Sequence, residues 1–249
     1  MLPTSVVITG LGALTPIGSN VEAYWNGLVS GQSGAAPITS FDTAKHKTKF
    51  ACILKEYDPH NYLDAKDVRR MDPFAQYAMV AGDEAIHDAG LITPLVDKER
   101  VGVVWGSGIG GLGTIETTIL EFFRNGMDPR INPFFIPKII PDIPSGHLSI
   151  KYGFKGPNFA TVAACASAVN AIVTAFQLIK LGDADVVVAG GSEAPIIQLG
   201  VAGFNALKAL STRNEDYLTA SRPFDKTRDG FVMGEGAGAL VLESYAHAQ

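Results

Sequence analysis

Hydrophobic and polar positions divide the chain into short apolar runs and longer segments with helical spacing. The apolar runs are rich in β-branched residues and end in glycine or polar residues, which is typical of strands. They lie at residues 5–12, 101–105, 158–164 and 185–191. The longer segments predict helices at residues 20–31, 71–90, 112–123 and 166–179. Alternating strands and helices predict an α/β fold with a mainly parallel sheet.

Capping residues place the ends of two of these helices. Asn20 is suited to cap the first helix and Gly31 follows its end, while Asp72 and Pro73 begin the second and Gly90 ends it. Three weaker patterns remain: a Pro-rich loop from residue 132 that leads into a helix near residue 152, a helix through residues 204–209, and two strands around glycines in residues 229–244.

Residues 166–179 form a helical segment without a charged residue. A helix on the surface of a globular protein shows a polar stripe, so this helix is expected to be covered on all sides, as it would be between two sheets. The uncharged stretch 156–179 approaches the length of a membrane span. Polar residues are spread through it, however, and Gly156-Pro157 would interrupt a helix. We therefore expect a strand followed by a buried helix, and no membrane span.

Composition narrows the functional classes. Hydrophobic residues make up 47% and charged residues 18% of the 249 residues, which favours a well-packed globular protein over a disordered one. The net charge of −5 gives no general attraction for nucleic acid or for an anionic membrane. Two cysteines do not make a disulfide framework, and the start of the chain lacks the basic region of a signal peptide. A cytoplasmic setting is therefore expected.

The run GSGIGG at residues 106–111 matches a dinucleotide-binding pattern. That pattern needs an acidic residue at the end of a second strand about 20 positions later, where this chain has the loop-like GMDPRINPFF. Glycines of a tight turn are therefore the favoured interpretation. The five histidines are isolated and form no metal-ligand motif, so no metal is expected.

Cys165 lies between the expected strand at 158–164 and the expected helix at 166–179. Backbone N–H groups and the helix dipole at such a junction favour the thiolate form of a cysteine. The neighbouring residues are small, which leaves space for a bulky acyl thioester: Ala163, Ala164, Ala166 and Ala168. A buried cysteine acting as a small apolar side chain fits the same residues, so local chemistry leaves both roles open.

Several stretches together resemble the β-ketoacyl-[acyl-carrier-protein] synthases. They are VVITGLGALTPIG, TVAACASAVNAI, LGDADVVVAGGSEA, ALKALSTRNED and SRPFDKTRDGFVMGEGAGALVLE. Two more, GSGIGGLGTIE and PFFIPKIIP, resemble most the type II elongating enzymes of bacterial fatty acid synthesis. The resemblance covers essentially the whole chain and identifies Cys165 as the nucleophile. It also accounts for the glycines at 106–111 without a nucleotide.

The resemblance implies the thiolase fold, in which two similar α/β halves pack as five layers, αβαβα, with the nucleophile helices between two sheets. Residues 1–249 are then the N-terminal half, with a mainly parallel mixed sheet. The implied reaction begins when the Cys165 thiolate takes an acyl group from an acyl carrier protein. Malonyl-carrier protein then loses CO₂, and its carbanion attacks the acyl-cysteine to give a 3-oxoacyl chain. The backbone N–H of Cys165 would supply one oxyanion donor.

The same resemblance implies partners and limits. No cofactor is expected, because phosphopantetheine arrives on the carrier protein, and a homodimer is expected. The family's two catalytic histidines, its active-site lysine and its glycine-rich gate loop lie in the second half, so condensation is not expected of this chain alone. Two other interpretations stay open: a polyketide-type ketosynthase, and a non-catalytic half-domain that binds carrier protein or dimerises.

The resemblance also assigns substrate and partner contacts. Ile109, Phe135 and Phe204 would line or close the acyl channel, with Phe135 reaching towards a partner subunit; ordinary core packing is the alternative for each.

A basic patch is expected to attract the acidic carrier protein, because the chain as a whole is negatively charged. By the resemblance, that patch comprises Lys66, Arg69 and Arg70, with Lys208 beside them. A solvated run of charges is the alternative.

Overall fold

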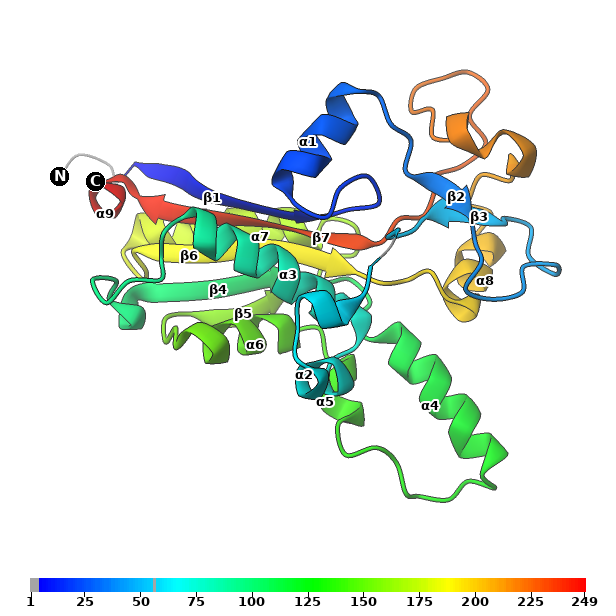
Figure 1. The fold of residues 1–249 in the computed structure, drawn as a ribbon, viewed down its shortest axis with the longest axis horizontal. Helices are drawn as coiled ribbons and strands as arrows, with labels where there is room; N and C mark the ends of the chain where they lie inside the picture. The colour runs from blue at the N-terminus through cyan, green and yellow to red at the C-terminus, as the bar shows by residue number, and fades with distance from the viewer. Residues whose placement is uncertain (1–4, 56) are drawn as a thin grey trace.

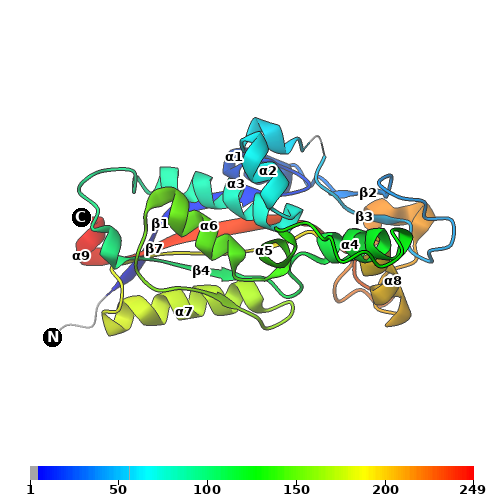
Figure 2. The same ribbon diagram turned by 90° about the horizontal axis from the view of Figure 1, so that it is seen from below.

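The computed structural model describes residues 5–55 and 57–249, and it is built around one mixed sheet with helices on both faces (Figures 1 and 2). The first four residues, on which the expectation of no signal peptide partly rests, lie outside the described residues. The strands are β1 (Val6–Leu14), β2 (Ala35–Pro37), β3 (Phe50–Cys52), β4 (Val101–Gly106), β5 (Asn158–Thr161), β6 (Val186–Glu193) and β7 (Gly236–Ser244).

The α-helices and short 3₁₀ helices connect these strands. The α-helices are α1 (Val21–Val29), α2 (Ala65–Arg70), α3 (Pro73–Asp88), α4 (Leu112–Arg124), α5 (Phe135–Ile139), α6 (Ile143–Tyr152), α7 (Ser167–Leu181), α8 (Gln198–Ala206) and α9 (Tyr245–Ala248). The 3₁₀ helices are η1 (Pro59–Asn61), η2 (Lys98–Arg100) and η3 (Asn214–Thr219).

The main sheet has five strands in the order β1-β7-β6-β4-β5. β4 pairs in parallel with both β5 and β6, while β7 is antiparallel to its two neighbours, β6 and β1. Four strands therefore point one way and β7 alone opposes them, which confirms the mainly parallel mixed sheet. The buried strand β4, VGVVWG, has no polar face because helices cover both of its sides.

Helices α3 and α6 cover one face of the sheet (Figure 2). Most of α3 is buried, and glycines on β1 allow it to lie directly on the strand. A Cβ on Gly10 would come within 2.2 Å of the Ala85 carbonyl oxygen, and one on Gly12 within 1.9 Å of the Ala81 carbonyl oxygen. Asp72 caps α3 by accepting from the N–H of Phe74 at 3.2 Å, as its position before Pro73 predicts.

Helix α7 covers the opposite face (Figure 2), and here one expectation needs correction. Ala171, Ala175 and Ile179 are buried against the sheet, but Val173 and Phe176 on the other face are each 46% exposed. The uncharged helix is thus covered on one side only, because this chain provides a single large sheet. Residues 164–181 are long and apolar enough to cross a membrane, a test that a core helix also passes.

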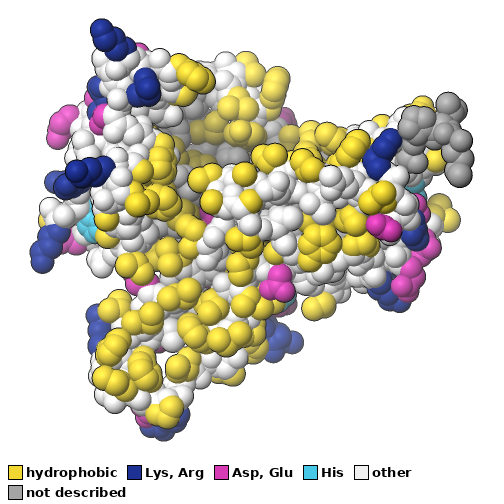
Figure 3. Space-filling model, turned by 180° about the vertical axis from the view of Figure 1, so that it is seen from behind, with side chains coloured by type: hydrophobic (Ala, Val, Ile, Leu, Met, Phe, Trp, Pro, Cys, Tyr) yellow, Lys and Arg dark blue, Asp and Glu magenta, His cyan; other side chains and the backbone are white. Residues whose placement is uncertain are grey.

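Two outlying parts extend from the C-terminal end of the parallel strands. The small β2–β3 sheet, α8 and η3 lie together at one end of the molecule, and the α4–α5 segment projects away from the body (Figure 1). None of the residues of α4 is buried. Seen from behind, hydrophobic side chains gather across the α7 face and over this projecting arm (Figure 3).

Two weaker predictions were wrong in detail, and a third was confirmed but incomplete. The helix expected at 204–209 runs instead from Gln198 to Ala206. Within residues 229–244 there is one strand, β7, which begins at Gly236, and Phe231 and Gly234 make only isolated bridges, to Leu210 and Cys52. The Pro-rich segment contains the short helix α5 before the expected helix, α6. In each case the local pattern was short, and contacts with distant residues decided the structure.

Candidate active site

Cys165 lies in the five-residue connection between the end of β5 at Thr161 and the start of α7 at Ser167, and its side chain is exposed. The sequence places it at the helix start, but the capping residue is Ala166, so the sulfur-bearing residue lies just before the helix. The position still combines an accessible thiol with the N-terminal end of a helix. This is the kind of place in which a cysteine acts as a nucleophile.

The connection has a tightly specified backbone. Ala164 has φ 48°, in the left-handed region that alanine rarely adopts. The Ser167 hydroxyl accepts a hydrogen bond from the N–H of Ala163 at 2.9 Å and donates one to the carbonyl oxygen of Ala164 at 2.7 Å. Thr161 Oγ1 donates to the Ser167 carbonyl oxygen at 2.8 Å. Sequence reasoning missed Ser167, although a serine at a helix start is a common hydrogen-bonding partner of the preceding turn.

Glycines bring the start of α7 close to the ends of β4 and β6. Gly106 and Gly191 are paired in the sheet. A Cβ on Gly106 would lie 2.4 Å from the carbonyl carbon of Ser167, and one on Gly191 2.5 Å from the Cβ of Ala168. Contacts this short do not occur, so a side chain at either glycine would push α7 and its preceding loop away from the sheet.

The glycine turn at 106–111 is occupied by a carboxylate of the chain itself. Glu193, at the end of β6, accepts hydrogen bonds from the N–H of Gly108 and from Ser107 Oγ, the latter at 3.3 Å. Burial raises the pKa of Glu193, and the hydrogen bond from Gly108 opposes this rise. Its other oxygen, Oε2, is buried without a hydrogen-bond partner among the described residues. The sequence signal that could have revealed Glu193 is an acidic residue that ends a strand beside a glycine turn.

This turn lies against the loop that carries Cys165. A Cβ on Gly108 would be 3.1 Å from the carbonyl oxygen of Ala164. Ile109, the next residue, is half-buried. The chain therefore brings Ile109 into the neighbourhood of Cys165, as the acyl-channel expectation requires.

Phe135 and Phe204 lie in other surroundings. Phe135 lines an open hollow of about 430 Å³ between the start of α3, α4 and α5, and neither Ile109 nor Phe204 lines it. Phe204 packs at the edge of a small core with its ring 5.6 Å from that of Phe231. The three residues do not form one channel within this chain, so their shared role remains a prediction.

The expected docking cations divide into two groups. Lys66 and Arg69 are exposed on α2, whereas the Arg70 guanidinium lies 4.9 Å from the centre of the Phe134 ring. Lys208 follows α8, which lies apart from α2 in both ribbon views (Figures 1 and 2). In this chain, then, Lys208 does not extend the α2 cluster.

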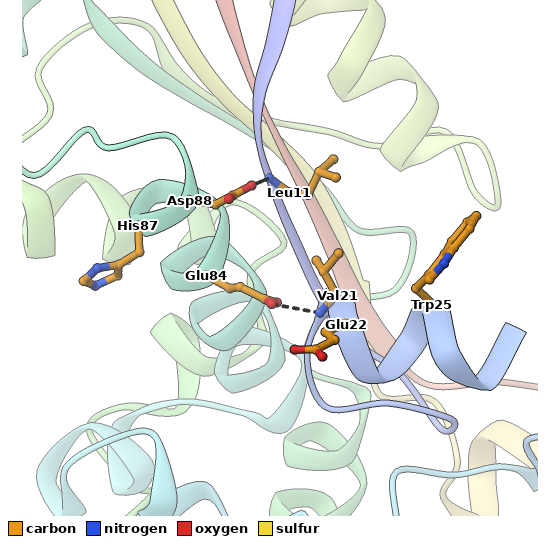
Figure 4. Close-up of a pocket in the computed structure, with 7 residues that line it drawn as sticks. All are labelled: Leu11, Val21, Glu22, Trp25, Glu84, His87 and Asp88. Atoms are coloured by element: carbon orange, nitrogen blue, oxygen red, sulfur yellow. Dashed lines mark hydrogen bonds between the residues drawn. The ribbon is translucent and has the colours of Figure 1, made fainter. Parts of the chain in front are cut away.

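Another hollow, of about 540 Å³, lies between β1, α1 and α3 (Figure 4). The carboxylates of Glu84 and Asp88 in this hollow accept hydrogen bonds from backbone N–H groups. Glu84 accepts from the N–H of Ala13 and of Val21, each at 2.8 Å. Asp88 accepts from the N–H of Leu11 at 2.9 Å. β1 is an edge strand, and the bonds from Leu11 and Ala13 satisfy two of its N–H groups that face away from β7. The hollow lies at the opposite edge of the sheet from β5, so we assign it a structural role.

Cys52 and the possible metal-binding side chains are the other groups to consider. Cys52 is half-buried in β3, and burial raises the pKa of its thiol, an effect that Lys55 partly opposes. Within residues 5–55 and 57–249, no group of three or more His, Cys, Asp or Glu side chains is placed to hold a metal ion.

Comparison with known proteins identifies the family of this chain. A family model described as "Beta-ketoacyl synthase, N-terminal domain" matches residues 4–248. The chain is 48% identical to 3-oxoacyl-[acyl-carrier-protein] synthase 2 of Vibrio cholerae, a match that covers 98% of this chain and 59% of that protein. It is 49% identical to the synthase of the same name from Staphylococcus aureus, with coverage of 98% and 58%.

Solved structures show the same relationship. A β-ketoacyl synthase from Burkholderia phymatum is 32% identical with a TM-score of 0.88, covering 98% of this chain and 60% of that one. The ishigamide ketosynthase/chain length factor is 30% identical with a TM-score of 0.89, covering 99% and 60%. The chain thus spans about three fifths of the length of these relatives. With its thiolase-like architecture and its match from residue 4 to residue 248, the chain belongs to the family of β-ketoacyl synthase N-terminal domains.

Proposed function

We propose that this chain is the part of a 3-oxoacyl-[acyl-carrier-protein] synthase that takes up the acyl group, with Cys165 as the nucleophile. The exposed Cys165 beside the start of α7 carries the proposal, and the family membership supports it. In the acyl-transfer step, the Cys165 sulfur forms a bond to the acyl carbon as the bond to the donor sulfur breaks. The departing thiolate takes a proton and leaves as the free thiol.

The acyl donor in this proposal is an acyl carrier protein. The names of the curated relatives contain this partner, and one related structure is of a ketosynthase with an acyl-carrier protein, at 29% identity and a TM-score of 0.84. The chain needs no cofactor of its own in this scheme, because phosphopantetheine belongs to the carrier protein. We place the protein in the cytoplasm as a homodimer.

Condensation belongs to the whole enzyme in this proposal. Decarboxylation of malonyl thioester needs donors for the developing enolate, and the resemblance assigns them to a segment beyond the residues matched here. We therefore expect the 249-residue chain to accept an acyl group slowly and to make no detectable 3-oxoacyl product.

The test is acylation of the purified chain by an acyl-loaded carrier protein, read by intact mass and peptide mapping. One acyl group on the peptide that contains Cys165 is expected, and its loss in Cys165→Ala but not in Cys52→Ala. Acylation that survives in Cys165→Ala would reject the assignment. If the carrier protein binds without any acylation, the non-catalytic half-domain becomes the better interpretation.

A polyketide-type ketosynthase is the second candidate. Two of the related structures, the ishigamide ketosynthase and the AntDE:AntF complex, are ketosynthases with TM-scores of 0.89 and 0.84. Their identities of 30% and 29% are well below the 48% of the Vibrio synthase, which favours the first candidate. Preference for saturated acyl chains over β-oxo chains in the acylation assay would separate the two.

A further inference from the structure

One side chain, Ser167, spans the loop that carries Cys165. Its hydroxyl joins two backbone groups, the N–H of Ala163 at 2.9 Å and the carbonyl oxygen of Ala164 at 2.7 Å. Ser167 is only 3% exposed, so water does not readily replace these bonds. The two bonds act on the residues that immediately precede the nucleophile.

Ala164, which directly precedes Cys165, has a strained backbone conformation. Ala164 has φ 48°, a conformation that costs free energy for any residue with a Cβ. Such a conformation persists only when surrounding contacts hold it. The Ala164 carbonyl accepts both from the Ser167 hydroxyl, at 2.7 Å, and from the Ser167 N–H, at 3.1 Å. On the other side, the loop is confined by Gly108.

We propose that Ser167 is a positioning residue for Cys165. By holding Ala164 in the left-handed conformation, its hydroxyl fixes the direction in which the Cys165 side chain leaves the loop beside the start of α7. Ser167 acts through the backbone and touches no acyl group. This inference rests on the proposed function, in which Cys165 is the acylated residue.

Ser145 provides a matched control. It is also a fully buried serine in the first turn of a helix, and its hydroxyl also donates to the carbonyl three residues earlier, that of Asp142, at 2.7 Å. Asp142 has an ordinary φ of −84°, however, and Ser145 lies on α6 on the other face of the sheet. Replacing Ser145 removes the same kind of hydrogen bond, together with a bond of 3.2 Å to Asn158 Oδ1 at the start of β5, but removes no bond to residues 162–166.

The measurement is the rate at which iodoacetamide alkylates Cys165, with Cys52 in the same molecules as the reference. In Ser167→Ala we expect the Cys165 rate to fall about threefold or more relative to Cys52, because a sulfur that is no longer held in its exposed position is less accessible to the reagent. Ser145→Ala should leave the ratio within about twofold of the unmodified chain. An unchanged ratio in Ser167→Ala would overturn the proposal.

A second substitution separates positioning from simple support of the fold. Glycine adopts positive φ without strain, so Ala164→Gly added to Ser167→Ala should return the Cys165 rate towards that of the unmodified chain. Faster labelling of both cysteines in Ser167→Ala, not reversed by Ala164→Gly, would mean that Ser167 only stabilises the fold, and would overturn the proposal. These rates do not depend on acyl transfer. A chain that carrier protein fails to acylate would refute the proposed function while the alkylation ratios still decide the role of Ser167.

Discussion

Glu193, at the end of β6, accepts a hydrogen bond from the backbone N–H of Gly108, in the turn that follows β4. A carboxylate of the chain thereby accepts from a backbone N–H of a glycine turn, the kind of donor that binds phosphate in nucleotide-binding proteins. Because Gly108 also lies against Ala164, the same bond connects the end of β6 to the loop that carries Cys165.

Glu193 makes stability depend on pH. Burial raises the pKa of its carboxyl group in the folded protein. The folded state therefore holds this proton more tightly than the unfolded state, and the resulting stabilisation is present at acid pH and is lost as pH rises through the folded pKa. Glu193→Gln keeps an acceptor for Gly108 and cannot ionise, so its stability relative to the unmodified chain should increase from pH 5 to pH 7.5.

Urea unfolding at the two pH values would measure this difference. Glu215→Gln, at an exposed carboxyl, is the matched control and should show no such pH-dependent gain. If Glu193→Gln and Glu215→Gln behave alike, the buried carboxyl of Glu193 does not control the turn.

Enlarging Ile109 should shorten the acyl chains that the protein accepts. In Ile109→Phe the larger side chain would fill space beside the Cys165 loop, so acylation by long-chain thioesters should fall about tenfold more than acylation by short-chain ones. Ile119→Phe, on the exposed surface of α4, is the control. An equal loss at all chain lengths would indicate damage to packing instead of a narrowed channel.

Carrier-protein binding should depend on the exposed cations of α2. Arg69→Glu should raise the Kd for the carrier protein about fivefold at low salt, and this effect should decrease as added salt screens the charges. Lys98→Glu is a suitable control, because η2 precedes β4 and so lies at the opposite end of the strands from the Cys165 loop. Arg70 is less suitable for this test, since its contact with Phe134 would also be lost. Titration by fluorescence anisotropy would decide, and equal affinities for the two variants would remove α2 from the docking surface.

The two cysteines should differ in reactivity. Cys165 is exposed, whereas Cys52 is half-buried and burial raises the pKa of its thiol. At pH 7.5 iodoacetamide should therefore label Cys165 first, because only the thiolate reacts. Peptide mass mapping after a short exposure would show this. Preferential labelling of Cys52 would contradict the expectation that Cys165 is the more reactive of the two thiols.

The apolar face of α7 should make the chain self-associate. The chain exposes 13396 Å². A compact monomer of 26.3 kDa is expected to expose about 10,600 Å². Part of this extra surface is apolar and lies on α7, where Val173 and Phe176 are each 46% exposed. Exposed apolar surface of this kind favours association.

Charge on that face should counter the association. Val173→Glu should shift the chain towards the monomer in light scattering, whereas Leu95→Glu, at a residue that is 91% exposed, should have no such effect. If the unmodified chain is a monodisperse monomer, the exposed apolar face of α7 does not drive self-association.

The sequence alone determined the class of fold, the long secondary-structure elements and the candidate site at Cys165. β4 and α3 have strong local patterns and clear caps, and the residues around Cys165 carry a specific family resemblance. The tertiary structure decided how that site is held. Glu193 and Ser107 are separated by 86 positions in the chain, yet their side chains form a hydrogen bond because β6 and β4 are neighbours in the sheet. No local pattern encodes such a pairing, since it depends on strand order. The exposure of one face of α7 was also decided by the tertiary structure. A helix that is apolar on all sides suggests that it lies between two sheets, but the part of this chain that the structure describes provides only one large sheet.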